Sequence, residues 1–278
     1  MCWSGSRSWI ASVRRADASR RTALALCTAC LTLSASRAFA QGRSGDSAGA
    51  LPPHVFAVNA ASVRPGLFEY STSLVHDTVS TPYGRRTVAF VQTAYAGAPA
   101  ALLLETRLSA MDSATDSLFV DPVTLAPLHW TGVLGAARLA FEFRGDTAYG
   151  GTVAPTGRRS AVTVVPAGTI VSAAMLETAL RALPLTAGYQ DSTATLSVNL
   201  HDEVLVPTSI SVIGRETVRV PAGSYDCWVV SVHAGDRGRG LYWVTTSNPI
   251  VVRSELDVGG TPGERYVSSL VSATPRFP

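Results

Sequence analysis

Residues 212–232, VIGRETVRVPAGSYDCWVVSV, constrain the fold more than any other stretch of the chain. They form two runs of alternating polar and apolar residues, joined at Pro221-Ala222-Gly223. A period of two is typical of strands with one buried face, and neighbouring Pro and Gly residues are typical of a turn. This stretch therefore predicts two antiparallel core strands joined at a corner.

Similar runs recur from Arg64 to the end of the chain, for example at residues 67–74, 87–95 and 138–143. They are separated by Gly, Pro and Asp, and we count about a dozen of them, well above the average for one sheet. Flat sheets of this size rarely persist. The pattern predicts one large curled antiparallel sheet or an open barrel.

One segment, residues 172–183, departs from the strand pattern. Its leucines and alanines recur at helical spacing, Ser172 is suited to cap the first turn, and Pro184 ends the run. It predicts a single helix with one buried face, which we expect to pack on the concave side of the sheet. The predicted fold class is therefore mainly β.

The first forty residues have the pattern of a signal peptide. Several arginines precede the apolar residues 22–33, and Ala38-Phe39-Ala40 supplies small residues at the cleavage positions. The apolar run is too short to span a bilayer as a helix, and no later segment is long enough either. We predict cleavage after Ala40 and a periplasmic or extracellular location, with no transmembrane segment in the mature chain.

The route of export stays open between two systems. Sec export is preferred, although residues 19–24 partly resemble a twin-arginine signal, and Cys30 partly matches a lipidation site.

Residues 41–63 are rich in Gly, Ser, Ala and Pro and predict a flexible leader, so that residues 64–278 form a single β-rich domain.

Composition excludes several classes of function. Removal of the predicted signal peptide leaves 17 basic and 19 acidic residues, so there is no basic surface to attract nucleic acid. Cys227 is then the only cysteine, which excludes an intramolecular disulfide and favours a small core residue. The histidines have no metal-ligand spacing, and we expect neither a metal nor another cofactor.

Glu216 is the candidate for a buried charge. Strand alternation, counted along the run, places it on the same face as Val212, Val218 and Val220, which is the apolar face and is predicted to be buried. A buried carboxylate needs a partner, and Arg253 and Arg138 are the candidates. Such a pair is more often structural than catalytic.

A second set of residues is suited to line a ligand pocket. Aromatic side chains on the predicted strands and leucines on the predicted helix would form apolar walls for a hydrophobic ligand. Aromatic residues on strands are, however, more often ordinary core residues. The pocket candidates are Trp228, Trp243, Tyr242, Leu176 and Leu180.

Residues 212–227 resemble a family of bacterial exported domains of unknown function that includes TapB-type proteins. The shared pattern is a Gly-x-Glu-x-Val strand, then Pro-Ala-Gly, Ser or Thr, and an aromatic residue; residues 180–185 and 241–244 fit the same family. The resemblance implies an envelope protein with a curved antiparallel sheet, similar in general shape to periplasmic lipoprotein carriers. It brings no established catalytic residues.

The leading hypothesis for function is an exported, non-catalytic, envelope-associated module that binds a lipid or another hydrophobic ligand in an apolar cleft. One alternative is a hydrolase that uses Glu216 in an open cleft. The other is a structural or interaction protein of the cell envelope. The sequence favours a non-enzyme, because no nucleophile–base pair or phosphate-binding loop is present.

Overall fold

The computed structural model describes residue 58 and residues 60–109, 113–154, 157–198, 203–235, 238–257 and 263–275. The predicted signal peptide, its cleavage after Ala40, Cys30 and most of the predicted leader lie outside these residues.

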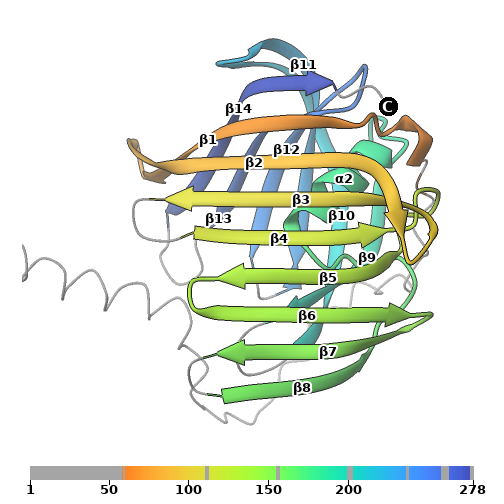
Figure 1. Ribbon diagram of the computed structural model, residues 1–278. Coiled ribbons are helices and arrows are strands. Elements are labelled where there is room, and N and C mark those ends of the chain that lie inside the picture. The colour runs from red at the N-terminus through yellow and green to blue at the C-terminus, as the bar shows by residue number, and fades with distance from the viewer. Residues whose placement is uncertain are drawn as a thin grey trace, which may run out of the picture. The chain divides into compact units, whose positions relative to one another are not determined.

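The described residues form strands, one α-helix and a short 3-10 helix (Figure 1). In chain order, the elements are η1 (Ala60–Ser62), β1 (Gly66–His76), β2 (Val79–Tyr95), β3 (Ala98–Ser109), β4 (Ser113–Val120), β5 (Pro127–Leu134), β6 (Ala137–Arg144), β7 (Thr147–Ala154), β8 (Gly157–Val164), α2 (Ala173–Ala182), β9 (Gln190–Val198), β10 (Glu203–Val220), β11 (Gly223–Ala234), β12 (Arg239–Thr245), β13 (Val251–Asp257) and β14 (Glu264–Pro275).

All the strands belong to one 14-stranded sheet in the order β8-β7-β6-β5-β4-β3-β2-β1-β14-β13-β12-β11-β10-β9. The first and last strands, β1 and β14, are antiparallel neighbours in the middle, so the chain leaves the middle of the sheet in one direction and returns from the other. Strands β8 and β9 are the two edges, and the segment that contains α2 connects them. The predicted large antiparallel sheet is confirmed.

Helix α2 begins and ends where the sequence predicts. The Ser172 hydroxyl accepts a hydrogen bond from the Met175 amide at 3.1 Å, and the Leu183 amide donates to the Ala179 carbonyl at the other end. Ile170, shortly before the helix, lies beside edge strand β9, because its amide donates to the Ala194 carbonyl at 2.9 Å and its carbonyl accepts from the Leu196 amide at 2.8 Å. The single predicted helix is therefore present.

The main core joins both halves of the sheet to the helix. Figure 1 shows β1–β8 as one layer, β10–β13 crossing behind it, and α2 between them. The two layers and the helix share one cluster of buried side chains, which includes Phe90, Leu103, Leu118, Trp130 and Phe141 from β2–β6, Ile210, Val230, Tyr242 and Val244 from β10–β12, and Met175 and Leu180 from α2. The sheet thus curls so that its inner face encloses the helix.

The corner between β10 and β11 forms at the predicted place. Val220 pairs with Gly223, which leaves Pro221 and Ala222 as the turn, and the Ala222 amide donates to the Leu270 carbonyl of β14 at 3.0 Å. Gly223 has a φ of +141°, a backbone conformation that residues with a Cβ atom rarely adopt. The glycine of the Pro-Ala-Gly sequence is therefore required by the backbone.

A β-bulge lies further back on strand β10. Val212 pairs with Val230, but the next paired residue, Gly214, lies opposite Val229. The extra residue, Ile213, reverses the alternation of faces along the rest of the strand. Val218 and Val220 consequently lie in a second core, together with Phe68, Tyr70, Cys227, Val229, Trp243, Val252 and Leu270.

Candidate functional site: a buried polar cluster under the helix

Three charged side chains meet between the sheet and the helix. Arg86 of β2 donates from Nε to Glu105 Oε1 of β3 and from Nη1 to Glu177 Oε1 of α2, each at 2.7 Å. The three residues are only 7%, 1% and 5% exposed, respectively. This ion triad is the most deeply buried group of charges in the described part of the chain, and it fixes α2 to the first half of the sheet.

The surroundings of the triad keep Arg86 charged. Burial disfavours its charged form, but the carboxylates of Glu177 and Glu105 outweigh burial and raise the pKa of Arg86 above its ordinary value. The guanidinium also lies over the ring of Tyr70, 5.1 Å from the centroid, and the Tyr70 hydroxyl donates to the Val251 carbonyl at 2.8 Å.

A second buried arginine, Arg181, holds the end of the helix. Its Nε donates to the Pro249 carbonyl at 3.0 Å, and its Nη2 donates to the Arg64 carbonyl at 2.9 Å. The guanidinium lies over the ring of Phe68, 4.6 Å from the centroid, and burial lowers the pKa of Arg181 to about 10. Helix α2 is therefore held to the sheet by polar contacts at two turns as well as by the main core.

The triad is connected to solvent along β3. Arg107, whose side chain is 49% exposed, lies with Nε 3.6 Å from Glu105 Oε1 and donates from Nη2 to Asp116 Oδ2 at 3.2 Å. Burial raises the pKa of Asp116, and the charge of Arg107 opposes that shift. The polar cluster thus extends from a dry interior to a half-exposed arginine.

Two atoms of the triad lack a hydrogen-bond partner among the residues that the structure describes. They are Arg86 Nη2, a donor, and Glu105 Oε2, an acceptor. Buried polar atoms are rarely left unpaired, because an unmade hydrogen bond leaves the loss of hydration uncompensated. A buried donor and a buried acceptor on paired side chains are therefore left with unused hydrogen-bonding capacity.

The buried tyrosines beside the triad predict a loss of stability at alkaline pH. Burial, together with the negative charge of Glu177, raises the pKa of Tyr70 and of Tyr242. The unfolded chain releases these protons near pH 10, whereas the folded chain retains them. The free energy of unfolding should therefore be unaffected by these groups below about pH 10 and fall above it, by up to about 1.4 kcal/mol per pH unit for each tyrosine.

Guanidinium denaturation followed between about pH 8 and pH 11 measures this slope. Tyr70→Phe and Tyr242→Phe should each reduce it, whereas Tyr149→Phe, at a tyrosine that is 42% exposed, should leave it unchanged. Equal slopes in the native chain and the Tyr70→Phe/Tyr242→Phe double variant would contradict the assignment.

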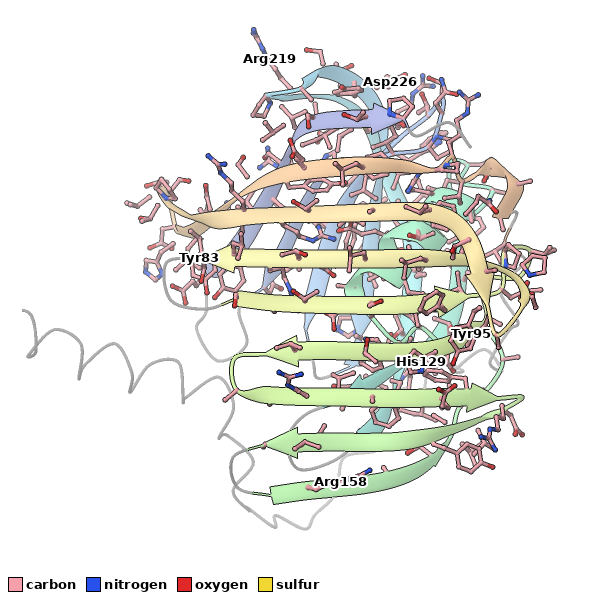
Figure 2. All side chains as sticks on the ribbon, viewed as in Figure 1. Tyr83, Tyr95, His129, Arg158, Arg219 and Asp226 are labelled. Atoms are coloured by element: carbon pink, nitrogen blue, oxygen red, sulfur yellow. The ribbon has the colours of Figure 1, made fainter. Side chains whose placement is uncertain are left out.

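A separate cluster lies on the outer face of the first half of the sheet. Figure 2 shows Tyr95 and His129 near each other, and their rings are stacked with centroids 5.6 Å apart. The Tyr95 hydroxyl donates to Glu142 at 3.0 Å, and His129 Nδ1 lies 2.8 Å from Glu142 Oε1. Phe119 packs against Tyr95 with centroids 4.8 Å apart. Glu142 is thus occupied by its own neighbours on the sheet.

Four of the five predicted pocket residues lie together. Trp228, Tyr242, Leu176 and Leu180 all belong to the main core or pack against it. Trp243 does not, because it follows Tyr242 directly on β12 and therefore points to the opposite face, into the second core. Whether the four residues line a ligand pocket stays a prediction.

Glu216 is exposed, so the prediction of a buried carboxylate is wrong. The bulge at Ile213 places it on the face opposite Val212, where its Oε1 accepts a hydrogen bond from Trp243 Nε1. Within the described residues it forms no ion pair with an arginine or a histidine. The convergence of groups that a Glu216 hydrolase requires is therefore not seen there.

The two arginines predicted to pair with Glu216 contact other residues instead. Arg253 lies over the ring of Trp243, 5.1 Å from the centroid, and pairs with Glu255 at 2.5 Å. Arg138 is exposed on β6, opposite Val133 and Val153. Neither arginine is a buried partner of Glu216, which corrects the predicted pair.

The ion triad was missed by the sequence reasoning, although a signal was present. Arg86 precedes Val88 and Phe90 at strand spacing, and Glu105 follows Leu103 in the same way. A charged residue in register with an apolar row points to the core and needs a partner. The sequence could thus have identified both residues as inward-facing charges, but not Glu177 as their shared neighbour.

Two further findings concern the described part of the chain as a whole. No group of three or more His, Cys, Asp or Glu side chains within the described ranges is placed to hold a metal ion. No helix in the same ranges is long and apolar enough to cross a membrane.

Two proteins are among the solved structures that match part of the chain. One, from Bacteroides fragilis, is described as an exported protein with a YmcC-like fold; it is 10% identical, the alignment covers 79% of this chain and 99% of that one, and the TM-score is 0.33. The other is a LolA superfamily protein from Nitrosomonas europaea, 9% identical, with coverage of 77% and 87% and a TM-score of 0.22.

No curated protein matches the chain. A family model does match it, over residues 70–264, which include the ion triad, helix α2 and the Pro-Ala-Gly corner. The match confirms membership of a family of unknown function, and it does not test the expected likeness to TapB-type proteins. The chain belongs to the family described as "Protein of unknown function (DUF3108)".

Proposed function

We propose that this protein is an exported, non-catalytic module that binds a lipid or another elongated hydrophobic ligand against the inner face of its sheet. One observation carries the proposal: the main core is bordered by apolar side chains that are only partly buried. They are Val58, Leu139, Phe143, Ala161, Leu176, Leu185, Tyr189, Val198, Leu205 and Trp228.

These side chains come from both ends of the sheet. Phe143 and Ala161 lie on β6 and β8, near one edge, while Val198 and Leu205 lie on β9 and β10, at the other. Leu176 comes from the helix that connects the two edges. Since β8 and β9 are not paired with each other in the sheet, a ligand that enters between these edges would meet apolar side chains on both sides.

The chemistry of this border favours binding over catalysis. It is formed by aliphatic and aromatic groups, and such surfaces gain affinity mainly from the removal of apolar area from water.

Export to the periplasm or the extracellular space, with cleavage after Ala40, is part of the proposal and rests on the signal pattern of residues 1–40. The closer resemblance to TapB-type proteins likewise rests on the Gly-x-Glu-x-Val and Pro-Ala-Gly sequence alone.

Ligand binding is tested on the full chain expressed in a host that exports it. Native mass spectrometry and solvent extraction of the purified protein should detect a co-purified amphiphile, and the delipidated protein should bind the neutral probe N-phenyl-1-naphthylamine with enhanced fluorescence. Absence of both a bound amphiphile and probe binding would contradict the proposal and favour a structural or interaction role in the cell envelope.

Leu176→Trp supplies the sharper form of this test. Leu176 is partly exposed on α2 and packs against the main core, so a larger side chain there should occupy space that the ligand uses. We expect probe affinity to fall about tenfold, which corresponds to about 1.4 kcal/mol of binding free energy. Leu108→Trp, at a residue that is 56% exposed on β3, is the matched control and should leave the affinity unchanged.

A further inference from the structure

We infer that the ligand of the inner face carries an uncharged head group with a hydroxyl, which binds between Arg86 Nη2 and Glu105 Oε2. The inference rests on the proposed function and specifies the class of ligand. It starts from the two buried atoms that have no hydrogen-bond partner in the described part of the chain.

The remaining capacity of the ion triad defines what would bind there. Arg86 already donates from Nε and Nη1 to the two glutamates, which leaves Nη2 as a donor. Glu105 already engages Arg86 and Arg107 through Oε1, which leaves Oε2 as an acceptor. A hydroxyl oxygen accepts from the first atom while its hydrogen is donated to the second, so one small group can complete both hydrogen bonds.

The charges around these atoms select against an ionic head group. Arg86 is flanked by Glu105 and Glu177. A further carboxylate, that of Asp116 on β4, is paired with Arg107 of β3. A phosphate or carboxylate would be repelled by the buried carboxylates, and an ammonium group would be repelled by the guanidinium. A neutral group that both donates and accepts avoids both repulsions.

The position of the triad suits an amphiphile. Leu103, two residues before Glu105 on β3, and Phe90, four residues after Arg86 on β2, both belong to the main core. Tyr242 of the opposite layer is close enough for its pKa to respond to Glu177, Arg86 and Glu105. A head group at the triad would therefore have its tail against the main core, between the two layers of the sheet.

The test compares matched amphiphiles on the delipidated full chain. Displacement of N-phenyl-1-naphthylamine is measured with 1-dodecanol, dodecyl methyl ether and dodecanoate, which share an alkyl chain and differ in the head group. We expect dodecanol to bind about tenfold more tightly than the ether and dodecanoate. The ether accepts a hydrogen bond but donates none, so its weaker binding reports the contribution of Glu105.

Glu105→Gln tests the residue itself. An amide that keeps its oxygen on Arg86 presents an NH2 donor in place of Oε2, so the preference for dodecanol over the ether should be lost. Glu142→Gln, at the partly exposed glutamate on the outer face, should retain that preference. If Glu105→Gln does not fold, the selectivity of the native chain decides the question without it.

The outcomes separate this inference from the proposed function. Equal affinities for dodecanol and the ether would overturn the head-group inference, and would indicate that a water molecule completes the two hydrogen bonds, but would leave hydrophobic binding intact. Tightest binding of dodecanoate would overturn the uncharged class. Failure of the probe and all three amphiphiles to bind would overturn the proposed function and this inference with it.

Discussion

Arg86→Met is expected to lower the free energy of unfolding by about 3–5 kcal/mol. Arg86 is the only partner that Glu105 and Glu177 share in the described residues, and both glutamates are buried. Methionine fills a similar volume but leaves Glu177 without its ion-pair partner, and Glu105 with only the longer 3.6 Å contact to Arg107, in a medium of low dielectric constant. Loss of one member of a buried ionic group is costly for this reason. Urea denaturation measures the change directly.

Two comparisons isolate the ionic contribution. The triple variant Arg86→Met/Glu105→Gln/Glu177→Gln removes every charge of the triad and should recover most of the stability, because no uncompensated charge remains. Arg215→Met removes an arginine from the exposed pair with Asp226 and should have a much smaller effect. An Arg86→Met variant no less stable than Arg215→Met would show that the triad does not hold the helix to the sheet.

Phe141→Ala is the second substitution with a large expected effect, a loss of about 3–5 kcal/mol. Phe141 is 1% exposed on β6 and stacks on Trp130 of β5, with ring centroids 5.9 Å apart. Truncation to alanine leaves a void among side chains from both layers of the sheet, and the surrounding core is expected to collapse only in part. Thermal and urea denaturation of the variant provide the measurement.

The matched controls use the same half of the sheet. Val153→Ala, at a residue that is 48% exposed on β7, should change the stability by less than about 0.5 kcal/mol. Phe141→Leu should lose less than half as much as Phe141→Ala, because a smaller void remains. If Phe141→Ala were as mild as Val153→Ala, strands β5–β8 would not share a core with α2.

The local elements were predictable because their signals are local. Residues 172–183 carry a capping serine, helical spacing and a terminal proline, and α2 forms there. Pro221-Ala222-Gly223 joins two alternating runs, and β10 and β11 meet at that corner. The number of alternating runs also predicted one large antiparallel sheet, since a strand with one apolar face must pair with neighbours and cover that face.

The faces of individual side chains were less predictable. Counting in steps of two from Val212 assigns Glu216 to the face of the main core, but the bulge at Ile213 shifts the count by one. Glu216 therefore lies on the opposite face with Val218 and Val220, where the valines are buried and the carboxylate is exposed. Gly214, inside the run, was the available signal of a bulge. The misplacement of Trp243 could have been avoided from the sequence alone, because two adjacent residues on a strand, Tyr242 and Trp243, cannot both line the same face.

The complete ion triad could not be predicted from the sequence, because its three residues come from three different elements. Arg86 and Glu177 are separated by 91 residues, and no local pattern states which strand a helix will face. The sequence by itself determined the strands, the helix, the corner and the apolar periodicity, since these depend on interactions between near neighbours along the chain. Only the tertiary structure decided that the sheet curls around α2 and that Arg86, Glu105 and Glu177 meet in its interior. Those contacts depend on the register and curvature of all fourteen strands together.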